Sequence, residues 1–129
     1  ISRPALGLAE CAIRLGRSTE AIEAVEAALA LPGVAKRYQA MLWQLKARAL
    51  VAASGGREDA ERCDETAPPV RAWLDAAEGA LDQAEALGVG LPDLPAVRRQ
   101  VLRRRAVLDA TCPLGTPTAS EVLAPESTA

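Results

Sequence analysis

Five arginines near the end of the chain are the side chains whose chemistry stands out most: Arg98, Arg99, Arg103, Arg104 and Arg105. Guanidinium groups bind phosphates and carboxylates through paired hydrogen bonds, so this cluster could hold nucleic acid or an acidic partner. Residues 57–89, just before it, hold nine acidic side chains against three arginines. We favour a solvated face that exchanges surface ion pairs with those acids. All five arginines stay candidate partner-binding residues, although a nucleic-acid contact is disfavoured because no aromatic side chain lies among them.

The aromatic side chains are the second group of candidates. Tyr38, Trp43 and Trp73 are the only aromatic residues in the chain, which has no Phe. Tryptophans on a helix could line a groove that holds a peptide, but more often they fill the core. We keep the three as candidate partner-binding residues and favour core packing for the two tryptophans.

Several kinds of reactive site are excluded by composition. The chain has no histidine, which removes Ser-His-Asp triads, Cys-His pairs and His-ligated metals. Acidic pairs such as Asp64 and Glu65 lie in a polar connection, where no apolar pocket would shift a pKa. Gly55-Gly56 lacks the spacing of a phosphate-binding loop. We therefore predict no catalytic, cofactor-binding or metal-binding residue, no cofactor, and no enzymatic activity.

The number and spacing of the cysteines indicate in which cellular compartment the protein is located. Cys11, Cys63 and Cys112 are far apart in sequence and form no CxxC pair, which argues against a zinc site. Their odd number does not indicate a disulfide framework, so we expect free thiols and a cytoplasmic location. No run of about 18 apolar residues would cross a membrane. The chain does not begin with Met, and we expect it to be a piece of a longer protein.

Proline and glycine divide the sequence into helical segments. Apolar residues recur at helical spacing in each segment, and no segment alternates with period two. Residues 57–69 read as a mobile connection whose first half could form a helical turn, because they combine acidic residues with Pro68-Pro69. Asp93 is expected to cap the last helix, with Pro95 in its first turn. The expected helices run from Pro4 to about Leu15, Thr19 to Leu31, Val34 to Ala53, Pro69 to Leu87, and Asp93 to about Ala110.

The fold class that follows is all-α, with about five helices packed as antiparallel hairpins. The third segment carries apolar residues on two sides and should be the most buried. We place a helical domain at residues 1–110 and a mostly disordered tail at residues 111–129, where Thr, Pro, Ser and Ala dominate.

Residues 8–31, LAECAIRLGRSTEAIEAVEAALAL, resemble a tetratricopeptide (TPR) repeat. Leu8-Ala9, Gly16, Ala21, Val25 and Ala28-Leu29 fall on its characteristic positions, whereas Ala5 and Ala12 replace the usual aromatics and Pro32 lies one residue early. A looser second match starts at Trp43. The resemblance implies a short solenoid of stacked hairpins that binds protein partners on a concave face.

Residues 42–61, LWQLKARALVAASGGREDAE, resemble the TPR-type tails of bacterial cyclase- or ATPase-linked and LuxR- or MalT-like regulators. We therefore expect a non-catalytic protein–protein interaction scaffold within a larger bacterial signalling regulator. The partner is expected to be a protein, a peptide or a neighbouring domain, and the isolated chain to self-associate or be only marginally stable. The alternatives are the sensor arm of a LuxR-type activator and, less favoured, a nucleic-acid contact through the arginine helix; no membrane contact is expected.

Overall fold

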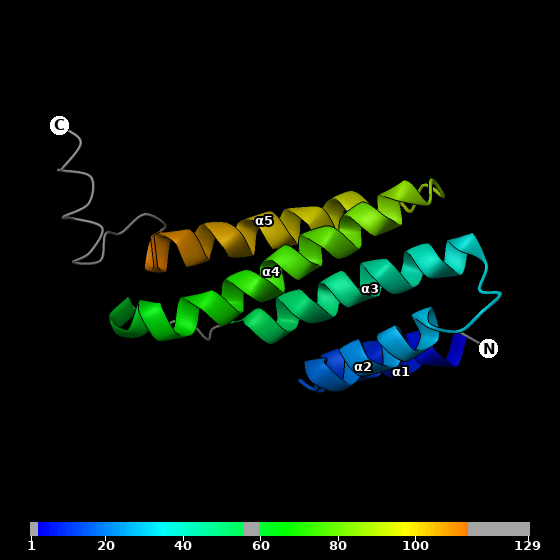
Figure 1. The fold of residues 1–129 in the computed structure, drawn as a ribbon, viewed down its shortest axis with the longest axis horizontal. Coiled ribbons are helices and arrows are strands. Elements are labelled where there is room, and N and C mark those ends of the chain that lie inside the picture. Colours follow the sequence, from blue (N-terminus) through cyan, green and yellow to red (C-terminus); the bar gives the residue numbers. More distant parts are fainter. Residues whose placement is uncertain (1–2, 56–59, 114–129) are drawn as a thin grey trace.

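The computed structural model describes residues 3–55 and 60–113. Within these ranges the chain forms five α-helices, one short 3-10 helix and no strand, which confirms the all-α class. Successive α-helices run in opposite directions, as the colours of Figure 1 show. The elements are α1 (Arg3–Arg14), α2 (Ser18–Leu29), α3 (Lys36–Ser54), η1 (Ala60–Arg62), α4 (Cys63–Ala86) and α5 (Leu94–Thr111).

Glycine ends two of the helices where the sequence predicts it. Gly16 and Gly88 have φ angles of +76° and +68°, in the left-handed region that side chains with a Cβ atom disfavour. Their amides donate to the carbonyl oxygens of Ile13 and Glu85, so they satisfy acceptors that the helix end leaves free. These turns return the chain against the helix that it has just left, and hairpins result.

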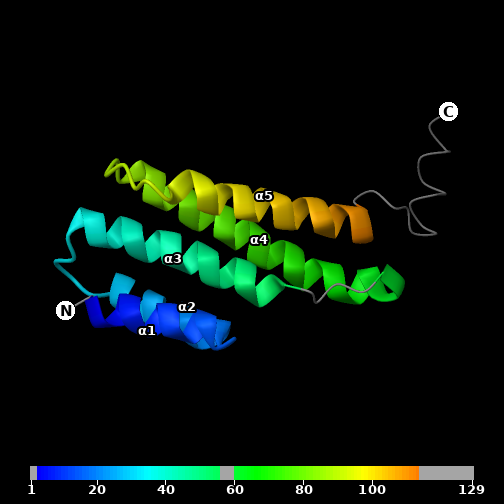
Figure 2. The same ribbon diagram turned by 180° about the vertical axis from the view of Figure 1, so that it is seen from behind.

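Helix α3 lies in the middle of the molecule and contacts each of the other four α-helices. Two of these contacts, those with α1 and α5, lie on the side of the molecule that faces the viewer in Figure 2. One hydrophobic cluster joins α1, α2 and α3, and a second joins α3, α4 and α5. The prediction that the third segment is the most buried is consistent with this position, since α3 contributes to both clusters.

The predicted inner faces of the last two helices are confirmed. Alanines on these faces let the helix axes approach, and the leucines and valines fill the space between them. All of the predicted residues are buried: Val70, Leu74, Ala77, Leu81 and Ala84 on α4, and Leu94, Val97, Val101 and Leu108 on α5.

Helix α4 begins six residues before the predicted start, so the prediction of a mobile connection is wrong for residues 63–69. The helical turn that the sequence allows in the first half of this segment is present as η1 at residues 60–62, while residues 56–59 lie outside the described part. Pro68 and Pro69 sit inside the helix. Each proline removes one amide donor and leaves a carbonyl one turn earlier without its helical hydrogen bond. Both prolines and the residues that carry these carbonyls, Asp64 and Glu65, are exposed, so water can satisfy the free oxygens.

Cys63 and Cys112 form a disulfide, and the expectation of three free thiols is wrong for these two. Their Cα atoms are 5.4 Å apart although the two cysteines are 49 positions apart in the sequence, because the antiparallel hairpin returns the end of α5 to the start of α4. Cys11 is free and exposed.

The described helical part therefore extends past the predicted domain end at residue 110. Thr111 completes α5, and the following Cys112 is buried and covalently tied to α4. The rest of the predicted tail, residues 114–129, lies outside the described residues. Among the described helices, none combines the length and the apolar character that crossing a membrane requires.

Candidate binding groove

Two adjoining pockets hollow the face built by α1, α3 and the start of α5, with volumes of about 320 and 280 Å³. We call the two together the α3 groove, because α3 forms its floor. Both pockets are lined by Gln44, Arg48 and Asp93. The larger pocket is completed by Leu6, Glu10, Met41 and Leu45, and the smaller one by Ala96, Val97 and Gln100.

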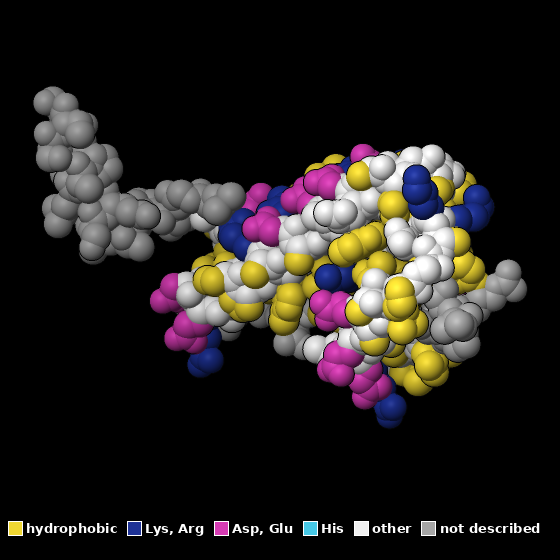
Figure 3. Space-filling model, turned by 45° about the vertical axis from the view of Figure 1, so that its right-hand side comes forward, with side chains coloured by type: hydrophobic (Ala, Val, Ile, Leu, Met, Phe, Trp, Pro, Cys, Tyr) yellow, Lys and Arg dark blue, Asp and Glu magenta, His cyan; other side chains and the backbone are white. Residues whose placement is uncertain are grey.

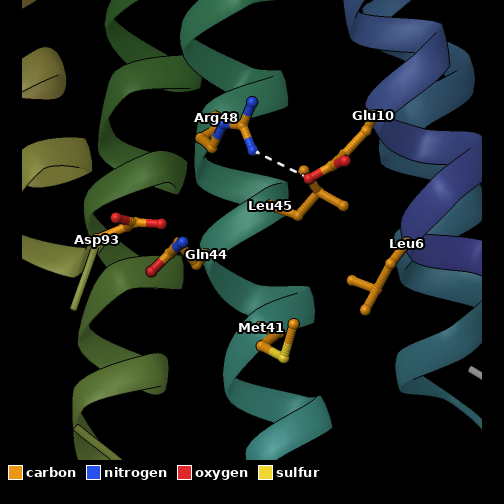
Figure 4. A pocket seen from close by; sticks show the side chains of 7 residues that line it. All are labelled: Leu6, Glu10, Met41, Gln44, Leu45, Arg48 and Asp93. Atoms are coloured by element: carbon orange, nitrogen blue, oxygen red, sulfur yellow. Dashed lines mark ion pairs between the residues drawn. The ribbon is translucent and has the colours of Figure 1, made fainter. Parts of the chain in front are cut away.

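The α1 side of the groove is apolar at its base. Leu6 of α1 and Leu45 of α3 point toward one another, and Met41 lies one turn before Leu45 (Figure 4). Leu45 is buried, while Met41 is 36% exposed. A methionine side chain adapts its shape to different apolar groups, so this end of the groove suits an aliphatic side chain.

One ion pair crosses the same pocket. The guanidinium of Arg48 lies 3.6 Å from the carboxylate of Glu10, and Figure 4 shows it linking α3 to α1. Both side chains are well exposed, at 37% and 48%, so the pair contributes at most about 1 kcal/mol to stability. Its effect on the groove is that the charge of Arg48 is already compensated.

The α5 side of the groove carries two acceptors that receive no donor within the described residues. The predicted cap residue Asp93 does occupy the N-cap position of α5, but its side chain makes no capping hydrogen bond, so that part of the prediction is wrong. Beside it lies Gln44, whose Oε1 atom is buried and accepts no hydrogen bond (Figure 4). An unsatisfied buried acceptor costs about 1–3 kcal/mol and is uncommon in native proteins. The groove is therefore polar and unsatisfied at this end.

None of the eight predicted partner-binding residues lines the α3 groove. Arg98 and Arg105 instead hold α5 to α4. Arg98 bonds Asp82 and Glu85 at 3.0 and 2.8 Å, and Arg105 bonds Asp75 and Glu78 at 2.7 and 2.6 Å. Figure 3 shows basic and acidic side chains next to each other along the upper edge of the molecule, where α4 and α5 lie. For these two arginines the favoured interpretation, ion pairing with the acidic helix, is confirmed.

The electrostatics of this interface keep both guanidinium groups charged. Burial lowers the pKa of Arg98, but hydrogen bonds to Asp82 and Glu85 and their negative charge outweigh that effect and raise it overall. The pKa of Arg105 is raised in the same way by Asp75 and Glu78, against the effect of burial. A raised pKa means that, while the partner carboxylates are ionised, the stabilising contribution is present at pH values below the ordinary pKa of arginine and is lost as the pH rises above it.

The other three arginines of the cluster lie in environments that differ from those of Arg98 and Arg105. Nη2 of Arg104 donates to the carbonyl oxygen of Ser54 at 2.5 Å, where a positive charge also suits the C-terminal end of α3. Arg99 and Arg103 are exposed. The five arginines thus fall into three environments: ion-paired with α4, bonded to the end of α3, and exposed to solvent. Their spacing in the sequence does not distinguish these environments.

The aromatic candidates are half-buried. Trp43 and Trp73 pack against the hydrophobic cluster of α3, α4 and α5, in agreement with the favoured interpretation of core packing. The ammonium group of Lys46 lies 5.2 Å from the centroid of the Trp43 ring, and it also pairs with Glu26 at 3.4 Å. Tyr38 is likewise half-buried.

The residues that line the groove were missed because their types are ordinary. Met41, Gln44 and Arg48 occupy the strip of α3 that lies between its two apolar sides, at the i, i+3 and i+7 spacing of one helix face. A mixed polar and apolar strip on the most buried helix is the signal that could have found them.

Residues 3–55 and 60–113 contain no group of three or more His, Cys, Asp or Glu side chains that could hold a metal ion. None of the known protein families matches the chain, and it matches no curated protein and no solved structure.

Replacing Arg105 by alanine is expected to lower the free energy of unfolding by about 1 kcal/mol, because two carboxylates on α4 lose their partner. The matched control is Arg99→Ala, also on α5 but exposed, which is expected to change stability by under about 0.5 kcal/mol. Urea unfolding at neutral pH and at two salt concentrations measures both, and the effect of Arg105→Ala should shrink at high salt. Equal effects of the two variants would contradict the assignment.

Proposed function

We propose that this chain is a non-catalytic protein–protein interaction module that binds an extended peptide segment of a partner in the α3 groove. The observation that carries the proposal is the groove itself, a hollow lined by both apolar and polar side chains across three helices. Binding sites for small segments are concave and combine an apolar surface with a few polar groups that orient the ligand.

The arrangement of the helices supports a TPR-like origin of this groove. Helices α1, α3 and α5 contact one another in sequence, as the first helices of stacked hairpins do. In such a stack the first helices form one face, and a ligand on that face touches several repeats. The regulator context, whether a signalling protein or a LuxR-type activator, stays a prediction, which the coding sequence on both sides of this segment would test.

A peptide selection tests the proposed function. A library of random linear peptides displayed on phage is selected against the folded chain, and an enriched peptide is synthesised and titrated by calorimetry. When the peptide is added, we expect the NMR chemical shifts of backbone amides to change along α3 and at the start of α5. Met41→Glu should weaken binding about tenfold or more, because it sets a charge against the apolar end of the groove.

The matched control for that experiment is Leu102→Glu. It makes the same kind of change at a side chain of α5 that is 52% exposed and lines neither pocket. We expect it to leave the dissociation constant within about twofold of the parent. The proposed function is wrong if no peptide is enriched, or if the amide shifts map outside the groove.

A cytoplasmic location also stays a prediction, and the disulfide bears on it. Disulfides persist mainly in oxidising compartments and are rare in the cytosol. Labelling of thiols in intact cells, followed by gel electrophoresis, would distinguish a reduced Cys63–Cys112 pair from an oxidised one.

A further inference from the structure

The α5 end of the groove presents one charged acceptor, the Asp93 carboxylate, and a second unsatisfied acceptor is buried beside it. The Asp93 carboxylate receives no hydrogen bond or ion pair from the described residues, and Oε1 of the adjacent Gln44 is buried without a donor. Because Arg48 is paired with Glu10, Asp93 is the charge of the groove that has no compensation. A ligand that fits this end must therefore bring N–H donors and a positive charge.

The α1 end of the groove suits an apolar group of the ligand. Leu6, Met41 and Leu45 form an apolar wall in the larger pocket, which Asp93 and Gln44 also line. A ligand in this pocket thus meets an apolar surface and the Asp93 carboxylate together. Within a polypeptide, an aliphatic side chain next to a basic one satisfies both.

Resting on the proposed function, we propose that the partner segment places an arginine or lysine side chain against Asp93 and Gln44, with a neighbouring aliphatic side chain in the Leu6–Met41–Leu45 wall. Arginine fits better than lysine. Its planar guanidinium has five N–H donors and can serve a carboxylate and an amide oxygen at once, once the Gln44 amide turns toward it.

Asp93 can be changed without disturbing the fold, which makes the proposal testable. Its side chain makes no capping hydrogen bond, and asparagine is an equally favoured residue at the start of a helix. Circular dichroism melting curves of Asp93→Asn should therefore overlie those of the parent. A loss of peptide binding then reports on the charge and not on folding.

The test uses the phage-selected peptides and a double-mutant cycle. We expect the selected sequences to share an arginine or lysine next to Leu, Ile or Met. Replacing that arginine by citrulline, a neutral side chain of nearly the same shape, should weaken binding about tenfold, and Asp93→Asn should do the same to the arginine peptide. The two changes together should cost little more than either alone, because they remove one interaction.

The outcomes separate this inference from the proposed function. Peptides that bind in the groove without a basic residue, or that bind Asp93→Asn as tightly as the parent, overturn the inference and leave the proposed function standing. Affinity that does not fall as salt rises overturns it as well, since an exposed charge pair is screened. If no selected peptide binds in the groove, both are wrong.

Discussion

Removing the Cys63–Cys112 disulfide is expected to lower the free energy of unfolding by about 4 kcal/mol. The bond closes a loop between cysteines that are 49 positions apart in the sequence, and without the bond a segment of that length gives the unfolded chain much additional freedom. It also ties the two ends of the α4–α5 hairpin that lie opposite the Gly88 turn. Here Arg71 adds hydrogen bonds to Asp109 at 2.7 Å and to the Cys112 carbonyl at 2.6 Å.

The measurement is urea unfolding of the oxidised parent, the reduced parent and a double variant, Cys63→Ala with Cys112→Ala. Cys11→Ala serves as the control, because this cysteine is free and exposed and its replacement should change stability by under about 0.5 kcal/mol. Reductant should destabilise the parent and leave the double variant unaffected. An unchanged midpoint on reduction would show that the bond contributes nothing to stability.

Leu74→Ala is expected to lower the free energy of unfolding by about 3 kcal/mol. Leu74 is fully buried in the middle of α4, within the cluster shared by α3, α4 and α5. Truncating it removes three carbon atoms, the γ carbon and both δ methyl groups, from the core and leaves a cavity that the surrounding helices fill only in part. Far-UV circular dichroism during urea unfolding measures the change.

Leu102→Ala makes the same truncation at a leucine of α5 that is 52% exposed, and it should cost under about 0.5 kcal/mol. Because α3 belongs to both hydrophobic clusters, we expect all variants to unfold in one transition. If Leu74→Ala and Leu102→Ala had equal effects, the packing described for α4 would be wrong. Two separate transitions would show that the α1–α2 hairpin unfolds independently.

Much of the fold could be predicted because it depends on neighbours in sequence. The buried face of α4, with Val70 and Leu81 among its members, follows from helical spacing alone. The start of α4 could not be predicted in this way. Pro68-Pro69 indicated a break, but exposure of the helix on that side makes two prolines tolerable, and exposure depends on what packs where.

The candidate site also combines features that the sequence predicts with features that depend on how the helices pack. The arginine cluster was visible in the sequence, yet its members serve different neighbours: Arg105 bonds α4, while Arg104 bonds the end of α3. The groove itself joins residues as distant as Leu6 and Asp93, and no spacing rule connects them.

The order of residues by itself determined that this chain is helical, where most of its helices end and which faces turn inward. These properties arise from interactions within a few residues, such as backbone hydrogen bonds one turn apart and glycine at the turns. Only the tertiary structure decided that Cys63 meets Cys112, that Arg98 is occupied by acids of α4, and that Asp93 and Gln44 share a groove. Each of those pairings joins side chains from separate helices, and the packing of the helices brings them together.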